Sequence, residues 1–363
     1  MIDDPRAWSE MEVDGRPIGV VVGHAALRRT ARDWIGYTSA TPFRVPIPEE
    51  SDLRPVRQYP IETDPPEHTA YRVAIAGRFD RRSADAIRPH VESVVDDVLG
   101  AAGRTRLSVV DELAIPVVAT GIAHTLGRPA DIDRIASWGL HVFSDPTTGA
   151  RRRNPDLDRY LADCVDAAIA DPGDDLFGDL ARSTVLGRPL TRDELLGYGY
   201  LVLAGGRDTV ISAIAGSVWY LASHPAANRE LADGRTGVAR AVEEFLRFFS
   251  PLGFIGRTVT ETGELIALGF AAANHDPTVF EQPDDIRLDR SPNRHVAFGH
   301  GPHTCIGAPL ARMQLAVVVE RVARRFTDSA SVRVVTPEAW QPVVERELST
   351  GSYVPLDLVI SLS

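Results

Sequence analysis

The sequence has little cysteine, few cations and no long hydrophobic run. Two cysteines among 363 residues are too few for a fold held together by several disulfides. The 39 lysines and arginines are outnumbered by 50 aspartates and glutamates, and the net charge of −11 argues against a general nucleic-acid-binding protein. The apolar stretch 113–123 is shorter than the roughly 20 residues that cross a bilayer, so we expect no membrane span.

We also expect no export signal. The N-terminus opens with the acidic "MIDD" and has no basic region followed by an apolar core, so we expect a cytoplasmic location. With 44% hydrophobic and 25% charged residues, the composition is that of an ordinary globular protein. Because we see no linker and no internal repeat, we expect a single domain over residues 1–363.

The spacing of apolar residues predicts a mainly α protein with a small β-region. From residue 69 to about residue 327 the spacing is mostly helical, and Thr191 and Glu194 have the spacing of a capping box at the start of one helix. Strands are expected at 18–22, in a hairpin within 256–270, and near the C-terminus.

The longest predicted helix runs from Thr191 to Pro225 and carries an unusual interruption. Gly205 and Gly206 each cost about 0.5–1 kcal/mol relative to alanine in a helix, and a charged pair follows them. Two explanations are open at this point: the glycines allow close helix packing, or they make room for a functional site.

The stretch "FGHGPHTCIG", residues 298–307, concentrates glycine, histidine and cysteine. Zinc is one possible ligand, but the spacing of His300, His303 and Cys305 lacks a second cysteine pair and does not match the usual zinc fingers. The alternative is a thiolate just before a helix, where backbone N–H groups stabilise its charge. Such a thiolate is suited to be the axial ligand of haem iron.

This stretch resembles the haem-thiolate signature of the cytochrome P-450 superfamily, in which a phenylalanine, two glycines, a basic residue and a cysteine occur at fixed spacing. The resemblance implies haem b (iron protoporphyrin IX) with Cys305 as its iron ligand. It also implies that Phe298 packs beside the thiolate and that His303 reaches a haem propionate. Three glycines complete the implied haem-binding loop: Gly299, Gly301 and Gly307.

Other stretches resemble the same family in the same order. Glu244 and Arg247 match its ExxR helix, where the ion pair is structural. "DPPEHTAYR" resembles its propionate-binding helix, and His68 and Arg72 are four residues apart, on one helical face. Arg257, in "FIGRTV", matches a further propionate-binding arginine.

"GGRDT", residues 205–209, resembles the family's oxygen-activating motif. The resemblance implies that Gly205 and Gly206 make room for O2 and that Asp208 and Thr209 form an acid–alcohol pair. Cleavage of the O–O bond requires protons, and a carboxylate with a hydroxyl can hold the waters that deliver them.

The sequence departs from the family pattern in three places. The N-terminal helix and first strand are expected to be missing or much reduced before residue 16, and a second small hairpin is expected to be missing after Arg257. Asp285 occupies a position where the ExxR network usually has an arginine, so Arg287 or Arg290 would have to substitute. We therefore expect a somewhat truncated cytochrome P-450 fold.

The resemblance implies a monooxygenase that uses O2 and electrons from a ferredoxin-type donor and its reductase. The expected substrate is a compact hydrophobic molecule, such as a terpenoid, an aromatic compound or a natural-product scaffold. Arginines that would form a basic docking face are Arg72, Arg78, Arg81, Arg82 and Arg312. Residues that would line the substrate pocket are Leu201, Leu252, Gly253, Phe254, Ile255 and Gly351.

Two alternative functions also involve haem. A peroxide-driven peroxygenase would bind haem through Cys305 but would be expected to replace the pair Asp208 and Thr209. A non-catalytic haem sensor would bind haem without turnover.

Overall fold

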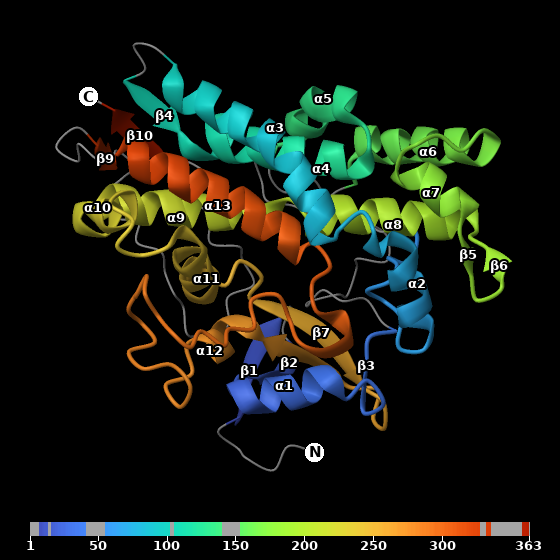
Figure 1. The fold of residues 1–363 in the computed structure, drawn as a ribbon. Helices are drawn as coiled ribbons and strands as arrows, with labels where there is room; N and C mark the ends of the chain where they lie inside the picture. Colours follow the sequence, from blue (N-terminus) through green and yellow to red (C-terminus); the bar gives the residue numbers. More distant parts are fainter. Residues whose placement is uncertain are drawn as a thin grey trace.

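The computed structural model describes residues 7–13, 16–40, 55–101, 105–139, 153–326, 332–334 and 358–362. They form a mainly helical structure with small sheets, as predicted (Figure 1). The helical elements are α1 (His24–Arg32), α2 (Glu67–Ala76), α3 (Arg81–Gly100), η3 (Val109–Ala114), α4 (Ile115–Leu126), η4 (Pro129–Asp131), α5 (Ile132–Ser137), α6 (Pro155–Ala170), α7 (Leu176–Arg182), α8 (Arg192–Gly205), α9 (Asp208–Ser223), α10 (Pro225–Ala232), α11 (Val238–Phe249), α12 (Phe270–Asn274), η5 (Gly301–His303) and α13 (Ala308–Arg325). The strands are β1 (Trp8–Val13), β2 (Arg16–Val21), β3 (Tyr37–Thr38), β4 (Arg106–Ser108), β5 (Thr184–Val185), β6 (Arg188–Pro189), β7 (Phe254–Val259), β8 (Leu265–Gly269), β9 (Val332–Val334) and β10 (Val359–Leu362).

The largest sheet has five strands in the order β1-β2-β8-β7-β3. β2 and β8 run parallel, and the other neighbouring pairs run antiparallel. β7 returns directly into β8, with Thr258 opposite Leu265, through a turn in which Gly263 has a φ of +72°. Glycine adopts this left-handed conformation without steric cost. The predicted hairpin is therefore confirmed, and its strands follow one another without a further hairpin between them.

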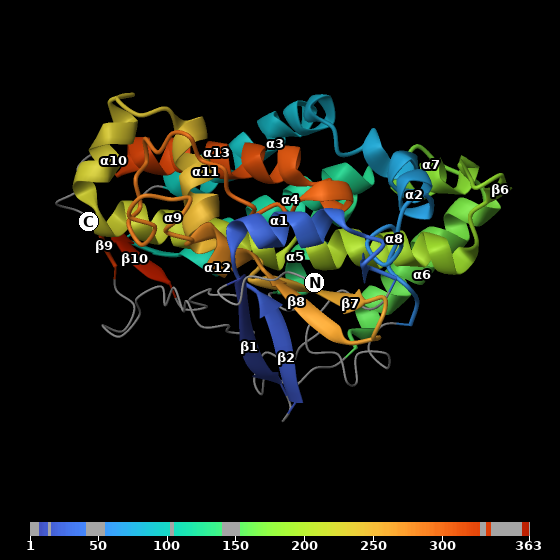
Figure 2. The ribbon, with the colours of Figure 1, turned by 90° about the horizontal axis from the view of Figure 1, so that it is seen from below.

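The expected loss of the first strand is wrong. β1 pairs with β2 along its whole length, with Trp8 opposite Val21 and Met11 opposite Ile18. Met11 is buried in a small cluster with Ile18 and Val20. Apolar residues in β1 do not alternate regularly, so its period-2 signal is weak, and pairing with β2 is what makes it a strand. Figure 2 shows this hairpin projecting from the rest of the molecule.

The helical side is built around α13. This helix packs along α3 and α9, and in Figure 1 these helices and α4 run across the molecule on the side opposite the five-stranded sheet. The Nε2 of Gln314 donates a hydrogen bond of 3.0 Å to the carbonyl of Val117, which joins α13 to α4. Near the start of α13, α1 packs against both η5 and β8, so α1 lies between the cysteine loop and the sheet.

The long helix predicted from Thr191 is broken near its centre. The capping box is confirmed: Thr191 and Glu194 each bond the other's backbone at the start of α8. α8 ends at Gly205, α9 begins at Asp208, and Arg207 is the N-cap residue of α9. The glycines and charges thus mark a break between two helices.

Two helical stretches satisfy the length and hydropathy expected of a bilayer span, Val109–Leu126 and Arg192–Ser223. Apolar helices of this length also occur in the cores of soluble proteins. In the structure, 78% and 67% of their most apolar 18-residue windows are buried inside the protein. We therefore interpret both as core helices.

Candidate functional site

Cys305 lies in a loop that ends where α13 begins. Its N–H donates a hydrogen bond of 2.7 Å to the carbonyl of Phe298, which closes the loop on itself. Gly299 and Gly301 have φ values of +73° and +76°, a region that other residues rarely adopt. A Cβ at Gly301 would lie 2.7 Å from the carbonyl oxygen of Ala31, so a glycine is needed for α1 to approach this loop.

The Cys305 side chain is exposed although protein groups surround the loop. Desolvation by those groups raises the pKa of the thiol above its ordinary value, and the backbone N–H groups of Gly307 and Ala308, together with Arg72 and Arg312, partly offset this rise. A Cβ at Gly307 would lie 3.8 Å from the sulfur, an ordinary contact. These donors and cations favour the thiolate that a metal ligand must be. In contrast, Cys164 is buried in α6, and burial raises its pKa to about 11.

Phe298 is held from one side by a charged cluster. The Arg312 guanidinium lies 4.4 Å from the centre of the Phe298 ring and donates to both carboxylate oxygens of Glu243, at 2.6 and 2.8 Å. His295 also bonds Glu243, at 2.9 Å. Neither Glu243 nor His295 was predicted from the sequence, because nothing in the local pattern indicates that residues about 50 positions apart meet here. The cluster fixes the ring that the resemblance places beside the thiolate.

A buried basic cluster brings together residues from three parts of the chain. His68 of α2 and His303 of η5 have ring centres 4.2 Å apart. Burial, Arg72 and Arg257 lower the pKa of His68 to about 4, although Asp64 opposes this. Burial and the same cationic surroundings lower the pKa of His303 to about 2. Arg257, 3% exposed on β7, has its own pKa lowered to about 10 by burial.

These residues fit the carboxylates of haem. Within the described residues, Nδ1 of His68 and both ring nitrogens of His303 are buried without a hydrogen-bond partner. Buried polar atoms normally have partners, and buried cations are normally paired. Anionic propionates near this cluster would satisfy both needs, so the four predicted residues His68, Arg72, Arg257 and His303 would hold them.

The predicted acid and alcohol occupy the first turn of α9. The Thr209 hydroxyl donates to the carbonyl of Gly205 across the helix break, at 3.1 Å. A Cβ at Gly205 would meet one side-chain atom, Cδ1 of Leu201, at 3.9 Å, so this side of the break is open. A Cβ at Gly206 would instead lie 2.8 Å from the carbonyl oxygen of Val202. The free space is therefore beside Gly205. At position 206 the glycine instead allows a close contact with the backbone of Val202.

The predicted substrate-lining residues lie on different faces. Ile255 is buried in one apolar cluster, with Leu201 packed against it, and is two residues from Arg257 on the same face of β7. Phe254 points to the opposite face, against the cluster that contains Met11. Leu252 and Gly253 precede the strand, with Leu252 38% exposed. Gly351 lies outside the described residues. Since Phe254 and Ile255 cannot face one pocket, we keep Leu201 and Ile255 for the pocket.

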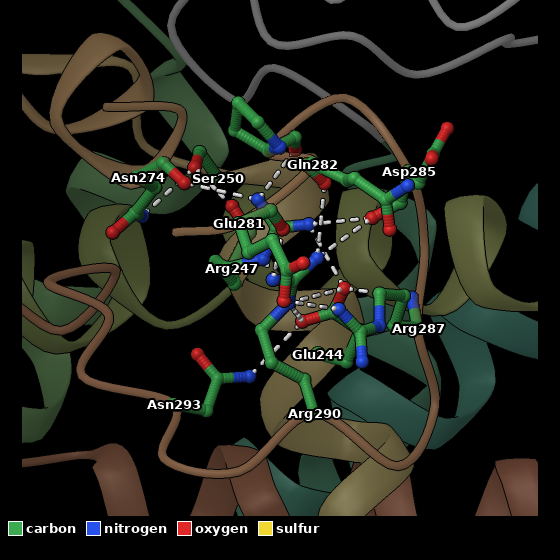
Figure 3. Close-up of polar contacts among 11 residues, drawn as sticks. Glu244, Arg247, Ser250, Asn274, Glu281, Gln282, Asp285, Arg287, Arg290 and Asn293 are labelled. Atoms are coloured by element: carbon green, nitrogen blue, oxygen red, sulfur yellow. Dashed lines mark hydrogen bonds and ion pairs between the residues drawn. The ribbon is translucent and has the colours of Figure 1, made fainter. Parts of the chain in front are cut away.

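The ExxR pair is completely buried and lies at the centre of a larger network (Figure 3). Arg247 donates to both carboxylate oxygens of Glu244, at 2.8 and 2.9 Å. Arg290 donates its Nε to the same two oxygens, at 3.0 and 3.1 Å, and further bonds the carbonyls of Glu281, Gln282 and Asp285. The network therefore contains an arginine, Arg290, although position 285 holds an aspartate. Of the two substitutes considered from the sequence, Arg290 is confirmed.

Arg287, the other candidate, donates its backbone N–H to Glu244, at 2.9 Å, and its side chain extends towards exposed Glu281.

We predict that Arg290→Met lowers the free energy of unfolding by about 3–5 kcal/mol, because it breaks a buried ion pair. Arg287→Ala is the matched control and should change it by no more than about 0.5 kcal/mol. Denaturant unfolding of both variants measures this, and equal losses would contradict the assignment to Arg290.

Three of the five arginines predicted to form a basic face have carboxylate partners of their own. Arg78 pairs with Asp179 at 2.6 Å, Arg312 with Glu243 at 2.6 Å, and Arg81 more loosely with Asp85 at 3.8 Å. Their positive charge is therefore partly neutralised, most strongly for Arg78 and Arg312.

The chain is similar to known cytochromes. The family described as Cytochrome P-450 matches residues 238–345. The Cytochrome P-450 monooxygenase PikC of Streptomyces venezuelae is 32% identical over 341 residues, which cover 87% of this chain and 80% of PikC. The vitamin D(3) 25-hydroxylase of Pseudonocardia autotrophica is 30% identical, over 84% of this chain and 80% of that protein. The solved structure of a carbohydrate active P-450 has a TM-score of 0.82 at 33% identity, covering 91% of this chain and 89% of that one.

The cysteine loop, the buried basic cluster and these relatives all indicate one class of protein. It is a haem-thiolate enzyme with a mainly helical fold. The chain belongs to the cytochrome P-450 family. It is a haem-dependent monooxygenase, an oxidoreductase.

Haem retention tests the buried cluster. We predict that Arg72→Ala with Arg257→Ala weakens haem binding by at least tenfold, because each charge-assisted hydrogen bond contributes about 1.5–3 kcal/mol. Arg81→Ala, a substitution of a largely exposed arginine, should leave binding unchanged. Transfer of haem to apomyoglobin measures the loss. Equal haem retention by the double variant and the parent would show that the propionates lie elsewhere.

Proposed function

We propose that the protein activates O2, with electrons from an external donor, to hydroxylate or otherwise oxidise a small hydrophobic molecule. One observation carries this proposal: an acid and an alcohol, Asp208 and Thr209, occupy the first turn of α9 beside the open side of Gly205. Bound haem supplies the iron at which O2 is reduced. Thr209, with its hydroxyl directed at the helix break, would hold water there, and Asp208 would exchange protons with that water.

Support for a hydrophobic substrate comes from the packing of Leu201 against the cluster that contains Ile255, on the face of β7 that also carries Arg257. Relatives act on varied molecules: one is named a vitamin D(3) 25-hydroxylase, and one solved neighbour is called carbohydrate active. We propose a compact apolar compound, such as a terpenoid, an aromatic compound or a natural-product scaffold.

We propose a ferredoxin-type protein, with its reductase, as the electron donor. Arg81 and Arg82 at the start of α3 are exposed, and the neighbouring α2 presents Val73 at 69% exposure near Arg72. A basic, partly apolar surface is complementary to an acidic partner. We further propose that residues 1–363 act as a single domain in the cytoplasm; the match to bacterial relatives extends over 84–87% of this chain and 80% of those proteins.

The experiment uses haem-loaded protein. A panel of terpenoids, aromatics, natural-product scaffolds and sugars is screened for a shift of the haem Soret band, and the compound with the largest shift is used as substrate. Product formation with reductant, ferredoxin and O2 supports the proposal. Product with hydrogen peroxide, but none with reductant and O2, indicates a peroxygenase instead, and absence of turnover with every donor indicates a haem sensor.

A further inference from the structure

Arg207 is the one residue of "GGRDT" to which the proposed chemistry assigns no task. It is the N-cap residue of α9, directly between Gly206 and Asp208. Its side chain is 2% exposed and is among the largest fully buried side chains of the described residues. A buried guanidinium at this position of the chain requires a physical reason.

The side chain reaches the C-terminal end of α5. One terminal nitrogen donates a hydrogen bond of 2.5 Å to the carbonyl of Ile135, and the other donates to the carbonyl of Gly139. The guanidinium carbon lies 5.9 Å from the centre of the Trp138 ring. Carbonyls at the end of a helix favour a nearby cation, and an aromatic face adds to this attraction.

The arrangement is costly for the charge. Burial lowers the pKa of Arg207 to about 10, although Asp208 opposes the effect. Nε is buried and has no hydrogen-bond partner in the part of the chain that the structure describes. An apolar side chain of similar volume would fill this space without desolvating a cation. The benefit therefore lies in the directed bonds to α5.

The backbone of the same residue starts α9. The carbonyl of Arg207 accepts the N–H groups of Val210 and Ile211, at 3.1 and 3.0 Å. Asp208 and Thr209 lie between this carbonyl and those donors. Because the side chain is anchored on α5, the first turn of α9 is anchored with it.

The far end of the connection is itself braced. The Trp138 indole donates to Asp156 of α6 at 2.8 Å, and Arg134 of α5 bonds both oxygens of the same carboxylate, at 2.9 and 3.1 Å. These bonds hold the end of α5 in place, so contacts with it can stabilise the break between α8 and α9.

We propose that Arg207 is a positioning residue: it ties the start of α9 to the C-terminal end of α5 and so holds Asp208 and Thr209 in the arrangement that delivers protons. This inference rests on the proposed function of that pair. It predicts that loss of the guanidinium loosens the first turn of α9 and diverts reductant to hydrogen peroxide.

The test compares haem-loaded Arg207→Met with the parent by amide hydrogen exchange and by product formed per reductant, using the substrate chosen in the Soret screen. We expect the N–H groups of Val210 and Ile211 to exchange roughly tenfold faster or more, since bonds to a charged group are lost. Product per reductant should fall several-fold, with haem content and the spectrum of the CO complex unchanged.

Arg192→Met is the matched control, because it makes the same substitution at the start of α8, where the guanidinium bonds exposed Asp166 and takes no part in the connection to α5. It should alter neither readout. Parent-like exchange and product yield in Arg207→Met would overturn the inference, as would the same changes in Arg192→Met.

If Arg207→Met fails to retain haem, Arg207→Lys decides the question. Its single ammonium group keeps the charge but cannot reproduce the planar guanidinium, so both readouts should change in the same direction by a smaller amount. Parent-like values for the lysine variant overturn the inference. Asp208→Asn is measured in parallel: if it leaves the rate of product formation unchanged, the proposed function fails, and if only the Arg207 variant has no effect, this inference alone fails.

Discussion

Cys305→Ala should abolish the red-shifted Soret band that the reduced protein shows with carbon monoxide. The band depends on a thiolate ligand, and the described residues bring no second cysteine to the loop, since Cys164 is buried in α6. Loss should be complete, because alanine has no atom that can ligate iron. The absorbance spectrum of reduced, CO-treated protein measures this directly.

Cys164→Ala is the control for the same measurement. Burial raises the pKa of Cys164 to about 11, so its thiol stays protonated and is not available as a ligand. Its substitution should leave the spectrum of the CO complex unchanged. A normal band in Cys305→Ala, or its loss in Cys164→Ala, would contradict the assignment of the iron ligand.

Asp208→Asn should slow turnover by about 10²–10⁴-fold, the usual range for the loss of an acid–base group. Asparagine has similar size and can still accept and donate hydrogen bonds, but it cannot exchange a proton near neutral pH. Haem uptake and substrate affinity should be unchanged, since neither is assigned to this residue. Rates of product formation with reductant and O2 measure the effect.

Thr209→Ala affects the same step in a different way. Without the hydroxyl that bonds the carbonyl of Gly205, the water that we propose at the helix break would lose a partner. Reductant and O2 should still be consumed, but a larger share should appear as hydrogen peroxide. Peroxide is counted together with product per reductant oxidised. Unchanged coupling in this variant and in Asp208→Asn would mean that protons arrive by another route.

Much of the site could be predicted because its residues occur in short, local patterns. Cys305 and its glycines lie within ten residues, His68 and Arg72 are one helical turn apart, and Gly205 to Thr209 are consecutive. Such spacing determines local geometry directly: left-handed φ values at the loop glycines, a shared helical face, and a break between α8 and α9. Helical periodicity likewise determined the mainly α fold class.

Contacts between distant parts of the chain required the tertiary structure. β1 has an irregular apolar pattern and becomes a strand through its pairing with β2. Arg290 lies 46 residues from Glu244, and only the folded chain distinguishes it from Arg287 as the partner. Side chains alternate between the two faces of β7, so Phe254 and Ile255 point to opposite sides although they are neighbours in the sequence.

The sequence by itself determined the residue types able to bind haem, the helical class and the position of the stretch that resembles an oxygen-activating motif, because these depend on neighbours along the chain. Only the tertiary structure decided which charged groups are paired: Arg207 with the end of α5, Arg312 with Glu243, and Glu244 with Arg290. The physical reason is desolvation. A buried charge is stable only beside partners that replace its water, and those partners are brought to it by packing rather than by sequence order.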